Sequence, residues 1–124
     1  MDAGVLVHGE LSERVIGAFF ETYNELGYGF LESVYEGAFA VQLEQAGLRV
    51  RRQAPIHVHF RGHVVGEFRA DLLVEELLLV EIKSAVRLHP IHEAQLINYL
   101  KATRVRLGLL VNFGPRPQFK RRVF

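Results

Sequence analysis

The sequence contains no cysteine. This absence excludes disulfide bonds, thiolate zinc sites and cysteine nucleophiles in a single step. The chain also has no apolar run near the roughly 20 residues that a membrane-spanning helix needs. Residues 1–10 lack the basic start and the apolar stretch of a secretion signal. We therefore expect a soluble, cytoplasmic protein that does not associate with a membrane.

The length and composition are those of one globular domain. The chain has 124 residues, of which 49% are hydrophobic and 23% are charged, and this balance argues against intrinsic disorder. A chain of this length can bury about two thirds of its unfolded surface, which is enough for one core. We expect residues 1–9 to form an N-terminal arm and residues 10–124 to form a single domain.

The small net charge of +1 hides a division along the chain. Residues 1–46 carry one base and eight acids, a balance of −7, whereas residues 47–124 carry fourteen bases and six acids, a balance of +8. The basic part could bind a polyanion such as nucleic acid, or it could pair with the acidic part inside one fold. Taken without the motifs below, the charge pattern favours the internal pairing.

Helical periodicity is present in three segments. Residues 10–26 and 30–46 have apolar positions at helical spacing, with Ser12 as the expected N-cap of the first helix. A glycine follows each of these segments and is expected to end the helix. The third predicted helix begins at Pro90, which suits a first helical turn, and runs to about Thr103.

Strand patterns occupy most of the remaining chain. The expected strands are 56–60, 64–74, 77–83 and 105–112, with turns at 61–62 and 75–76 and a polar connector at 48–55. The tail after residue 112 is expected to add an edge strand. In the second strand, Phe68, Ala70, Leu72 and Val74 are predicted to share one face. The order α-α-β-β-β-α-β predicts an α/β or α+β sheet that is flanked by helices.

The sharpest sign of chemistry is Asp71, followed ten residues later by Glu81-Ile82-Lys83. Side chains alternate along a strand, so Glu81 and Lys83 are predicted on one face, with Ile82 in the core. A turn at 75–76 would place Asp71 beside Glu81 on neighbouring strands. Two converging carboxylates suit Mg²⁺, and the Lys83 ammonium could hold an attacking water or steady the charge of a phosphate. The plain alternative is a Glu–Lys pair on an exposed sheet face.

Two further pairs of residues lie at helical spacing. Gln95 and Tyr99 are four residues apart on the third predicted helix and so share a face. Glu32 and Tyr35 are three residues apart at the start of the second helix. Each pair has a plain alternative, because Tyr99 could be an ordinary core residue with Gln95 as a solvated neighbour, and an acid is favourable near a helix N-terminus.

Together these features resemble the GxxExxY family, a branch of small proteins within the PD-(D/E)XK nuclease superfamily. Its namesake motif is present as Gly29, Glu32 and Tyr35. The resemblance covers residues 10–114 and continues through RAD (69–71), VEIK (80–83), H-x-x-QLINYL (92–100) and GLLVNF (108–113). It implies a restriction-endonuclease-like αβββαβ core, in which a mixed central sheet is flanked by helices. Ala70 departs from the pattern, because it stands where the superfamily name has proline.

The resemblance also implies catalytic roles. The residues concerned are Glu32, Asp71, Glu81, Lys83, Gln95 and Tyr99. Asp71 and Glu81, with Glu32 from the first core helix, would be the ligands of Mg²⁺, for which Mn²⁺ could substitute. Lys83 would lie beside the attacking water, and the other two residues resemble a Q-x-x-x-Y motif that lines the site of exonuclease branches. The implied reaction is hydrolysis of DNA phosphodiester bonds by metal-activated water.

The implied partner is nucleic acid, and we expect DNA. Basic side chains would contact its phosphates, and such contacts position nucleic acid without reading its sequence. The candidates are Arg49, Arg51, Arg52, Arg69, Arg87 and Lys101. For each of them, taken alone, a solvated surface charge is the plainer interpretation.

The histidines form two groups. His57 and His59 share a face of one predicted strand, and His63 follows beyond the turn. A transition-metal site is one interpretation of this group, but a solvated strand face is favoured. His89 and His92 lie at the start of the third helix. His92 is one helical turn before Gln95, so we expect it beside the residues of the proposed site and not among them.

Two functions of different classes remain in view. The first is a Mg²⁺-dependent nuclease. The alternative is a nucleic-acid- or partner-binding module of nuclease fold with little or no cleavage, because a chain close to the minimal core could rely on a homo-oligomer or a protein partner to grip a substrate. A purely structural protein is disfavoured, since carboxylates and a lysine gathered on a sheet are costly without a function.

Overall fold

The computed structural model describes residues 8–124, so most of the predicted N-terminal arm lies outside the described residues. The elements follow one another as α1 (Gly9–Leu26), α2 (Glu32–Gln45), β1 (Val50–Phe60), β2 (His63–Val74), β3 (Leu78–Lys83), α3 (Pro90–Thr103), β4 (Leu107–Phe113) and β5 (Pro117–Val123). The predicted order is confirmed, and the tail forms β5 as expected. Among these elements, no helix is long and apolar enough to cross a membrane.

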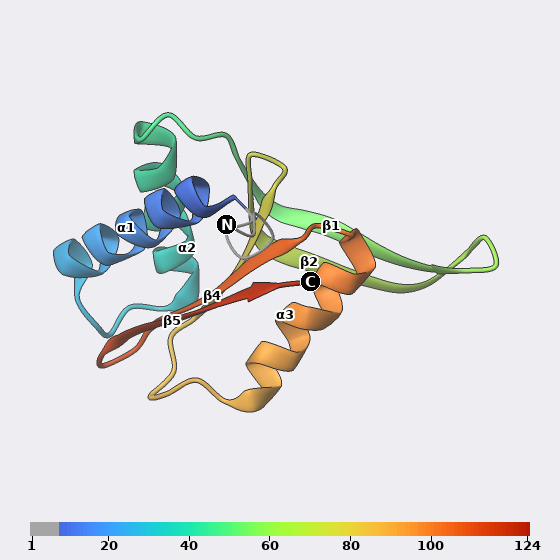
Figure 1. Cartoon of the computed structure of the whole chain (residues 1–124). Coiled ribbons are helices and arrows are strands. Elements are labelled where there is room, and N and C mark those ends of the chain that lie inside the picture. The colour runs from blue at the N-terminus through green and yellow to red at the C-terminus, as the bar shows by residue number, and fades with distance from the viewer. Residues whose placement is uncertain (1–7) are drawn as a thin grey trace.

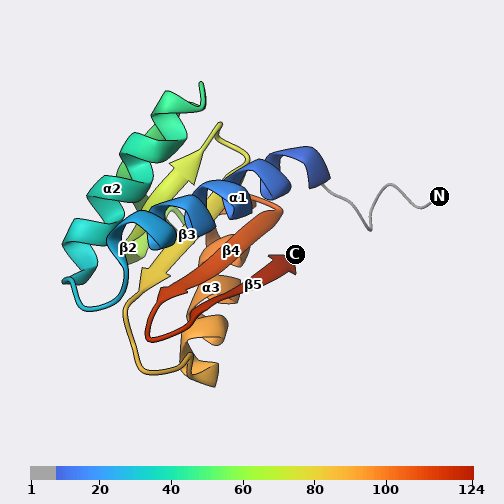
Figure 2. The ribbon, with the colours of Figure 1, turned by 90° about the vertical axis from the view of Figure 1, so that its left-hand side faces the viewer.

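The five strands form one sheet in the order β1-β2-β3-β4-β5. Strands β3 and β4 run parallel because α3 connects them, and the other neighbours are antiparallel. Helices α1 and α2 cover one face, and α3 covers the other (Figures 1 and 2). The predicted α+β fold with a mixed central sheet and flanking helices is therefore confirmed.

Two hydrophobic clusters hold the helices to the sheet. On the side of α1 and α2, the ring of Phe113 contacts Phe19 and stacks on Tyr35, with centroids 4.8 and 4.4 Å away. On the other side, Leu96 and Leu100 of α3 pack on β3 and β4. Because β3 and β4 are covered on both faces, their sequences are almost continuously apolar, as expected for central parallel strands.

Strand β1 begins earlier than predicted. Residues 48–55 were expected as a connector, yet β1 starts at Val50 and pairs with β2 from Val50 opposite Val74 to Phe60 opposite His63. The sequence hides this strand because Gln53 has a left-handed backbone, with φ of 51°, which interrupts the alternation of side chains. The prediction of a polar connector is therefore wrong for most of its length.

The expected helix ends are mostly correct. The N–H of Gly27 donates to the carbonyl of Tyr23 and closes α1, and Pro90 is the first residue of α3. Ser12 is not the N-cap of α1, because the helix begins at Gly9 and the Ser12 hydroxyl donates to the Gly9 carbonyl from within the first turn. The apolar periodicity therefore located this helix to within one residue at its start, and only the N-cap was assigned wrongly, since the residue at that position is His8.

The β1–β2 hairpin extends far beyond β3 as a two-stranded arm (Figure 1). Strand β2 pairs with β3 only from Leu72 to Val74. Beyond this point Ala70 packs in the cluster of α3, and the ring of Phe68 lies 5.6 Å from that of Tyr99. The prediction that these residues share a face with Leu72 is wrong, because the β1–β2 pairing is interrupted between Leu72 and Ala70, where Asp71 and the left-handed Gln53 are unpaired.

The loop after β3 is tied to the end of β4. The side chain of Asn112, fully buried, accepts from the N–H of Ala85 at 2.9 Å and donates to its carbonyl at 3.0 Å. A Cβ at Gly114 would collide with the same carbonyl oxygen. The G-L-L-V-N-F segment and the glycine after it therefore fix the path of the chain as it leaves Lys83.

We expect Asn112→Leu to lower the free energy of unfolding by about 2 kcal/mol or more, because it leaves the N–H and carbonyl of Ala85 unpaired at nearly constant side-chain volume. Urea unfolding measures the change. The control is Asn98→Leu on the exposed face of α3, for which the effect should stay within about 0.5 kcal/mol. Equal stability of the two variants would contradict the role of Asn112.

Candidate active site

Strands β2 and β3 part where each carries an acidic residue. Their pairing ends with Leu72 opposite Val80, so the next residues in register are Asp71 and Glu81. The N–H of Asp71 donates to Glu81 Oε2 at 2.9 Å, and the N–H of Ile82 donates to Asp71 Oδ2 at 2.7 Å. The two carboxylates take the place of strand-to-strand hydrogen bonds. They converge as the sequence predicts.

Burial and mutual repulsion oppose the ionised forms of both groups. Glu81 is 4% exposed, and burial, followed by the charge of Asp71, raises the pKa of Glu81 to about 8. Burial also raises the pKa of Asp71, although the hydrogen bond from Ile82 acts in the opposite direction. A cation placed between the carboxylates would offset this unfavourable negative charge.

Lys83 and Glu32 lie around this acidic pair. Strand β3 presents Lys83 on the face of Glu81, while Ile82 is buried in the opposite cluster, as predicted. The charge of Lys83 opposes the rise in the pKa of Glu81 that burial and Asp71 cause. Glu32, the first residue of α2, accepts from the N–H of Ser84 at 3.3 Å, and its charge adds to the raised pKa of Glu81. Lys83 of β3 and Glu32 of α2 therefore lie around the acidic pair, with Glu32 at its margin.

Helix α3 brings the predicted Gln95 and Tyr99 to the same region. Gln95 Nε2 donates to the Tyr99 hydroxyl oxygen at 2.9 Å, so the two share a face as predicted. Tyr99 is 5% exposed, and burial, followed by the charge of Glu81, raises its pKa. The phenol thus stays protonated near neutral pH, and its own O–H can donate toward the acidic pair or a ligand.

Two residues near the acidic pair were missed by the sequence analysis. Gln53 Nε2 donates to Glu36 Oε1 at 2.5 Å and to Asp71 Oδ1 at 3.3 Å. The charge of Glu36 contributes to the raised pKa of Asp71. Glu36 lies one helical turn after Glu32 on α2, and this spacing was the available signal for it. Gln53 fell in the supposed connector and gave no such signal.

The three residues of the Gly-x-x-Glu-x-x-Tyr motif have different roles in the structure. Gly29 has φ of 121°, a conformation that favours glycine, in the turn between α1 and α2. The fully buried Tyr35 donates through its hydroxyl to the Gly27 carbonyl at 2.5 Å and accepts from the N–H of Phe30 at 3.2 Å. Gly29 and Tyr35 therefore shape the turn that delivers Glu32 to the site.

The carboxylate oxygens of Asp71 and Glu81 suit a hard divalent cation. Within residues 8–124, no three His, Asp or Glu side chains lie close enough together to hold a metal ion. Glu32 is held at the Ser84 N–H, apart from the other two predicted ligands. Glu81 Oε2 and Asp71 Oδ2 accept backbone N–H groups, and Asp71 Oδ1 accepts the 3.3 Å bond from Gln53. Glu81 Oε1 and the second lone pair of Asp71 Oδ1 are therefore the positions that would bind Mg²⁺ or Mn²⁺.

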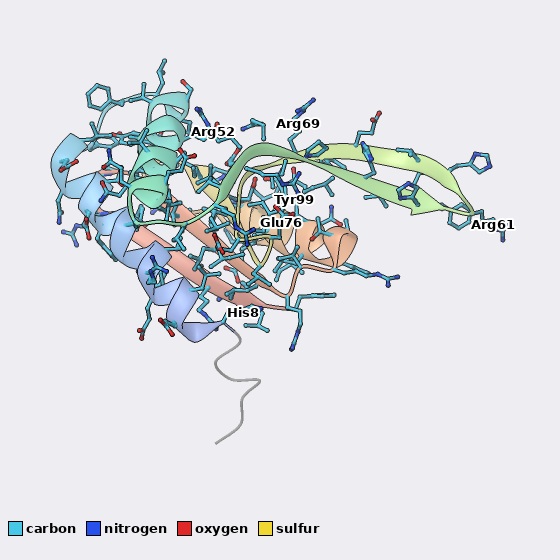
Figure 3. The ribbon with its side chains drawn as sticks, turned by 90° about the horizontal axis from the view of Figure 1, so that it is seen from above. His8, Arg52, Arg61, Arg69, Glu76 and Tyr99 are labelled. Atoms are coloured by element: carbon cyan, nitrogen blue, oxygen red, sulfur yellow. The ribbon has the colours of Figure 1, made fainter. Side chains whose placement is uncertain are left out.

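Half of the predicted phosphate contacts are exposed arginines in ion pairs. Arg49 pairs with Glu75 at 3.3 Å and Arg51 with Glu76 at 2.8 Å. Both pairs lie within the basic part of the chain and not between its two parts. Arg52 pairs with Glu36 at 3.0 Å and lies beside α2 (Figure 3), so it joins the acidic and basic parts.

The other three predicted contacts are exposed and outside these pairs. No ion pair described within residues 8–124 includes Arg69, Arg87 or Lys101. Arg69 lies near the base of the hairpin arm, which ends at Arg61 (Figure 3), and donates to the Gln53 carbonyl at 3.4 Å. Of these three residues, Arg69 is therefore the one with a described hydrogen bond to Gln53, which in turn contacts Asp71.

The histidines of the hairpin, His57, His59 and His63, are exposed on the strand face. His57 lies 3.6 Å from Glu67 on an exposed strand face. His92 caps α3 by accepting from the N–H of His89 at 3.2 Å. His92 also lines a hollow with Gln95 and Tyr99, so it lies at the margin of the candidate site, and its role there stays a prediction. Burial, followed by the charge of Lys83, lowers the pKa of His92.

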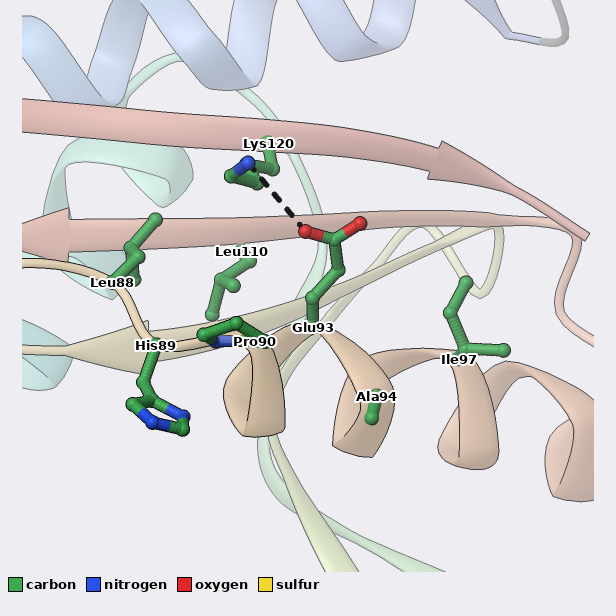
Figure 4. A pocket seen from close by; sticks show the side chains of 8 residues that line it. All are labelled: Leu88, His89, Pro90, Glu93, Ala94, Ile97, Leu110 and Lys120. Carbon is green, nitrogen blue, oxygen red and sulfur yellow. Dashed lines mark ion pairs between the residues drawn. The ribbon is translucent and has the colours of Figure 1, made fainter.

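One mainly apolar hollow beside α3 lies away from the carboxylates. It has a volume of about 410 Å³ between α3 and the β4–β5 edge (Figure 4). Its polar contact is the ion pair of Glu93 with Lys120, at 3.6 Å. None of the predicted catalytic residues lines it. The predicted catalytic residues therefore lie outside this hollow.

A mixed sheet with this strand order, two helices on one face, one on the other, and an Asp/Glu/Lys group on neighbouring strands defines a restriction-endonuclease-like protein. The sequence profile of the PD-(D/E)XK nuclease superfamily matches residues 9–123. The chain therefore belongs to this superfamily, as the resemblance implied.

Among solved structures, the chain is similar to the crystal structure of SSO0001, with a TM-score of 0.59 and 20% sequence identity over 98% of this chain. It spans 61% of the length of that chain. At this identity the likeness shows the fold alone. No curated protein matches the sequence significantly.

Without divalent cations, we expect stability to fall as the pH rises from about 4.5 to about 8. In this window native Glu81, with a pKa of about 8, keeps a proton that the unfolded chain, with a pKa near 4.5, has released. One such group gives a slope of at most about 1.4 kcal/mol per pH unit. Glu81→Gln should flatten the profile and be more stable than the wild type at pH 8–9.

Urea unfolding in the presence of a chelator, at several pH values, measures this profile. Glu67→Gln removes an exposed carboxylate of β2 and serves as the control, with a profile like that of the wild type. If Glu81→Gln kept the wild-type slope of unfolding free energy against pH, the pH dependence could not be assigned to Glu81.

Proposed function

We propose that this protein is a metal-dependent nuclease that hydrolyses phosphodiester bonds of DNA, within the GxxExxY branch of its superfamily. The observation that carries the proposal is the convergence of Asp71 and Glu81 at the parting of β2 and β3, with Lys83 on the face of Glu81. Membership of the nuclease superfamily supports the same reaction class.

Each residue of the chain has a distinct task in this proposal. Asp71 and Glu81 bind the divalent cation, and Glu32 from α2 adds negative charge at its margin. When bound, Mg²⁺ activates water and stabilises charge on the phosphate. Lys83 donates to the attacking water or to a phosphate oxygen. Tyr99, oriented by the hydrogen bond from Gln95, donates its O–H toward the substrate.

The phosphate backbone would be held by basic side chains around the site. Arg69, Arg87 and Lys101 are exposed and outside the described ion pairs, so they can bind phosphates without first losing an acidic partner. Arg49 and Arg51 would exchange their exposed glutamates for phosphates, which costs little because exposed ion pairs are weak. Such contacts give affinity that depends on salt concentration.

The alternative is a nucleic-acid- or partner-binding module with little or no cleavage. The pairing of Arg52 with the mostly buried Glu36 favours reliance on a partner, because it withdraws one basic side chain from the surface that would grip a substrate. A second copy of the chain or a protein partner would then supply the missing surface. The two functions differ in whether metal causes product release.

We expect Asp71→Ala, Glu81→Ala and Lys83→Ala each to lower cleavage about a hundredfold or more without unfolding the protein, because each removes a metal ligand or a donor to the reacting groups. The assay uses labelled single- and double-stranded DNA and RNA with Mg²⁺, with Mn²⁺ and with a chelator. Glu67→Ala is the matched control and should cleave as the wild type does.

Cleavage that survives all three substitutions would exclude this site as the catalytic centre. Salt-dependent DNA binding by folded wild-type protein, without product in either metal, would instead support the binding module. Cleavage of RNA but not of DNA would support phosphodiester hydrolysis at this site and would show that the substrate is RNA.

A further inference from the structure

Gln53 has an unfavourable backbone conformation in the middle of a strand. Its φ of 51° is left-handed, and residues with a side chain rarely adopt this region. Arg52 pairs with Leu72 and Ala54 with Ala70, but Gln53 and Asp71, between them, are not paired. Such strain persists only where the surrounding structure enforces it, and it is found at functional sites.

The side chain of Gln53 bridges two carboxylates. Its Nε2 atom donates to Glu36 Oε1 at 2.5 Å and to Asp71 Oδ1 at 3.3 Å. Glu36 is itself held by Arg52, whose Nη2 and Nε donate to Glu36 Oε2 at 3.0 and 3.2 Å. An exposed guanidinium thus anchors a mostly buried acid, and the acid anchors the amide that contacts Asp71.

The Asp71 carboxylate is consequently restrained at both oxygens. The N–H of Ile82 donates to Oδ2 at 2.7 Å, and Gln53 donates to Oδ1 at 3.3 Å. Each bond comes from a different strand, β3 and β1, on either side of β2. The carboxylate therefore cannot rotate freely about its terminal bond.

The neutrality of the amide is important. A lysine or arginine at this position would also donate to Asp71, but its positive charge would repel a divalent cation. Gln53 restrains the carboxylate and leaves its negative charge to attract the ion. Arg52, which does carry a charge, contacts Glu36 and not Asp71.

We propose that Gln53, anchored by Glu36 and Arg52, is a positioning residue that orients Asp71 for binding a divalent cation. This inference rests on the proposed function, since it concerns the same site. Outer-shell hydrogen bonds of this kind commonly contribute tenfold to a hundredfold to metal affinity. The backbone strain at Gln53 is the cost of placing its amide between the two acids.

Two substitutions separate positioning from stability. Gln53→Ala and Gln53→Gly both remove the amide, but glycine adopts the left-handed backbone without steric cost. We expect Gln53→Gly to unfold at a higher urea concentration than Gln53→Ala. We expect both variants to bind Mn²⁺ tenfold to a hundredfold more weakly than the wild type does, as measured by calorimetric titration of the folded protein.

The matched control is Gln42→Ala. Gln42 Nε2 on α2 donates to Glu21 Oε2 at 2.7 Å, an exposed amide–carboxylate bond away from the site. This variant should bind Mn²⁺ as the wild type does. In a cleavage assay, the Gln53 variants should lose kcat at saturating DNA while KM for DNA changes little, because Gln53 acts on the metal ligand and not on the substrate.

The outcomes distinguish the two proposals. Wild-type protein that binds Mn²⁺ but cleaves nothing, with affinity lost in both Gln53 variants, would overturn the proposed nuclease activity and support the positioning role. Wild-type cleavage with unchanged Mn²⁺ affinity and kcat in both variants would overturn the positioning role alone. The positioning role would also be overturned if Mn²⁺ affinity were lost in the less stable Gln53→Ala and retained in the more stable Gln53→Gly. Absence of Mn²⁺ binding by the wild type would overturn both.

Discussion

The parting of β2 from β3 is the feature on which the candidate site depends. Backbone groups at the edge of a strand must find partners when the neighbouring strand turns away. Here the carboxylates of Asp71 and Glu81 supply part of that pairing across the gap. The same two side chains therefore satisfy backbone groups of the sheet and concentrate negative charge at one point.

The remaining elements are arranged around this charge. Helix α2 contributes Glu32 and Glu36, β1 contributes Gln53, and α3 contributes Gln95 and Tyr99. In the absence of a cation the buried acids oppose one another, so the site lowers stability as the pH rises. A bound metal would reverse that effect. Functional sites commonly lower the stability of the fold in this way.

The motif residues illustrate why a sequence pattern does not assign one role to all its members. Gly29 and Tyr35 shape the turn before α2, whereas Glu32 reaches the site. Basic residues show the same division. Arg52, predicted as a phosphate contact, holds Glu36, while Arg69 remains exposed beside the base of the hairpin arm. Their roles toward nucleic acid stay predictions.

Local patterns in the amino-acid sequence were enough to predict the order of elements, the α+β class and the convergence of Asp71, Glu81 and Lys83, because periodicity and turn residues act locally. It could not place β1 from Val50, since the left-handed Gln53 interrupts the alternation. Nor could it reveal the bridge from Glu36 through Gln53 to Asp71. That bridge joins three elements that are distant along the chain, and only the packing of α2 against the sheet decided it.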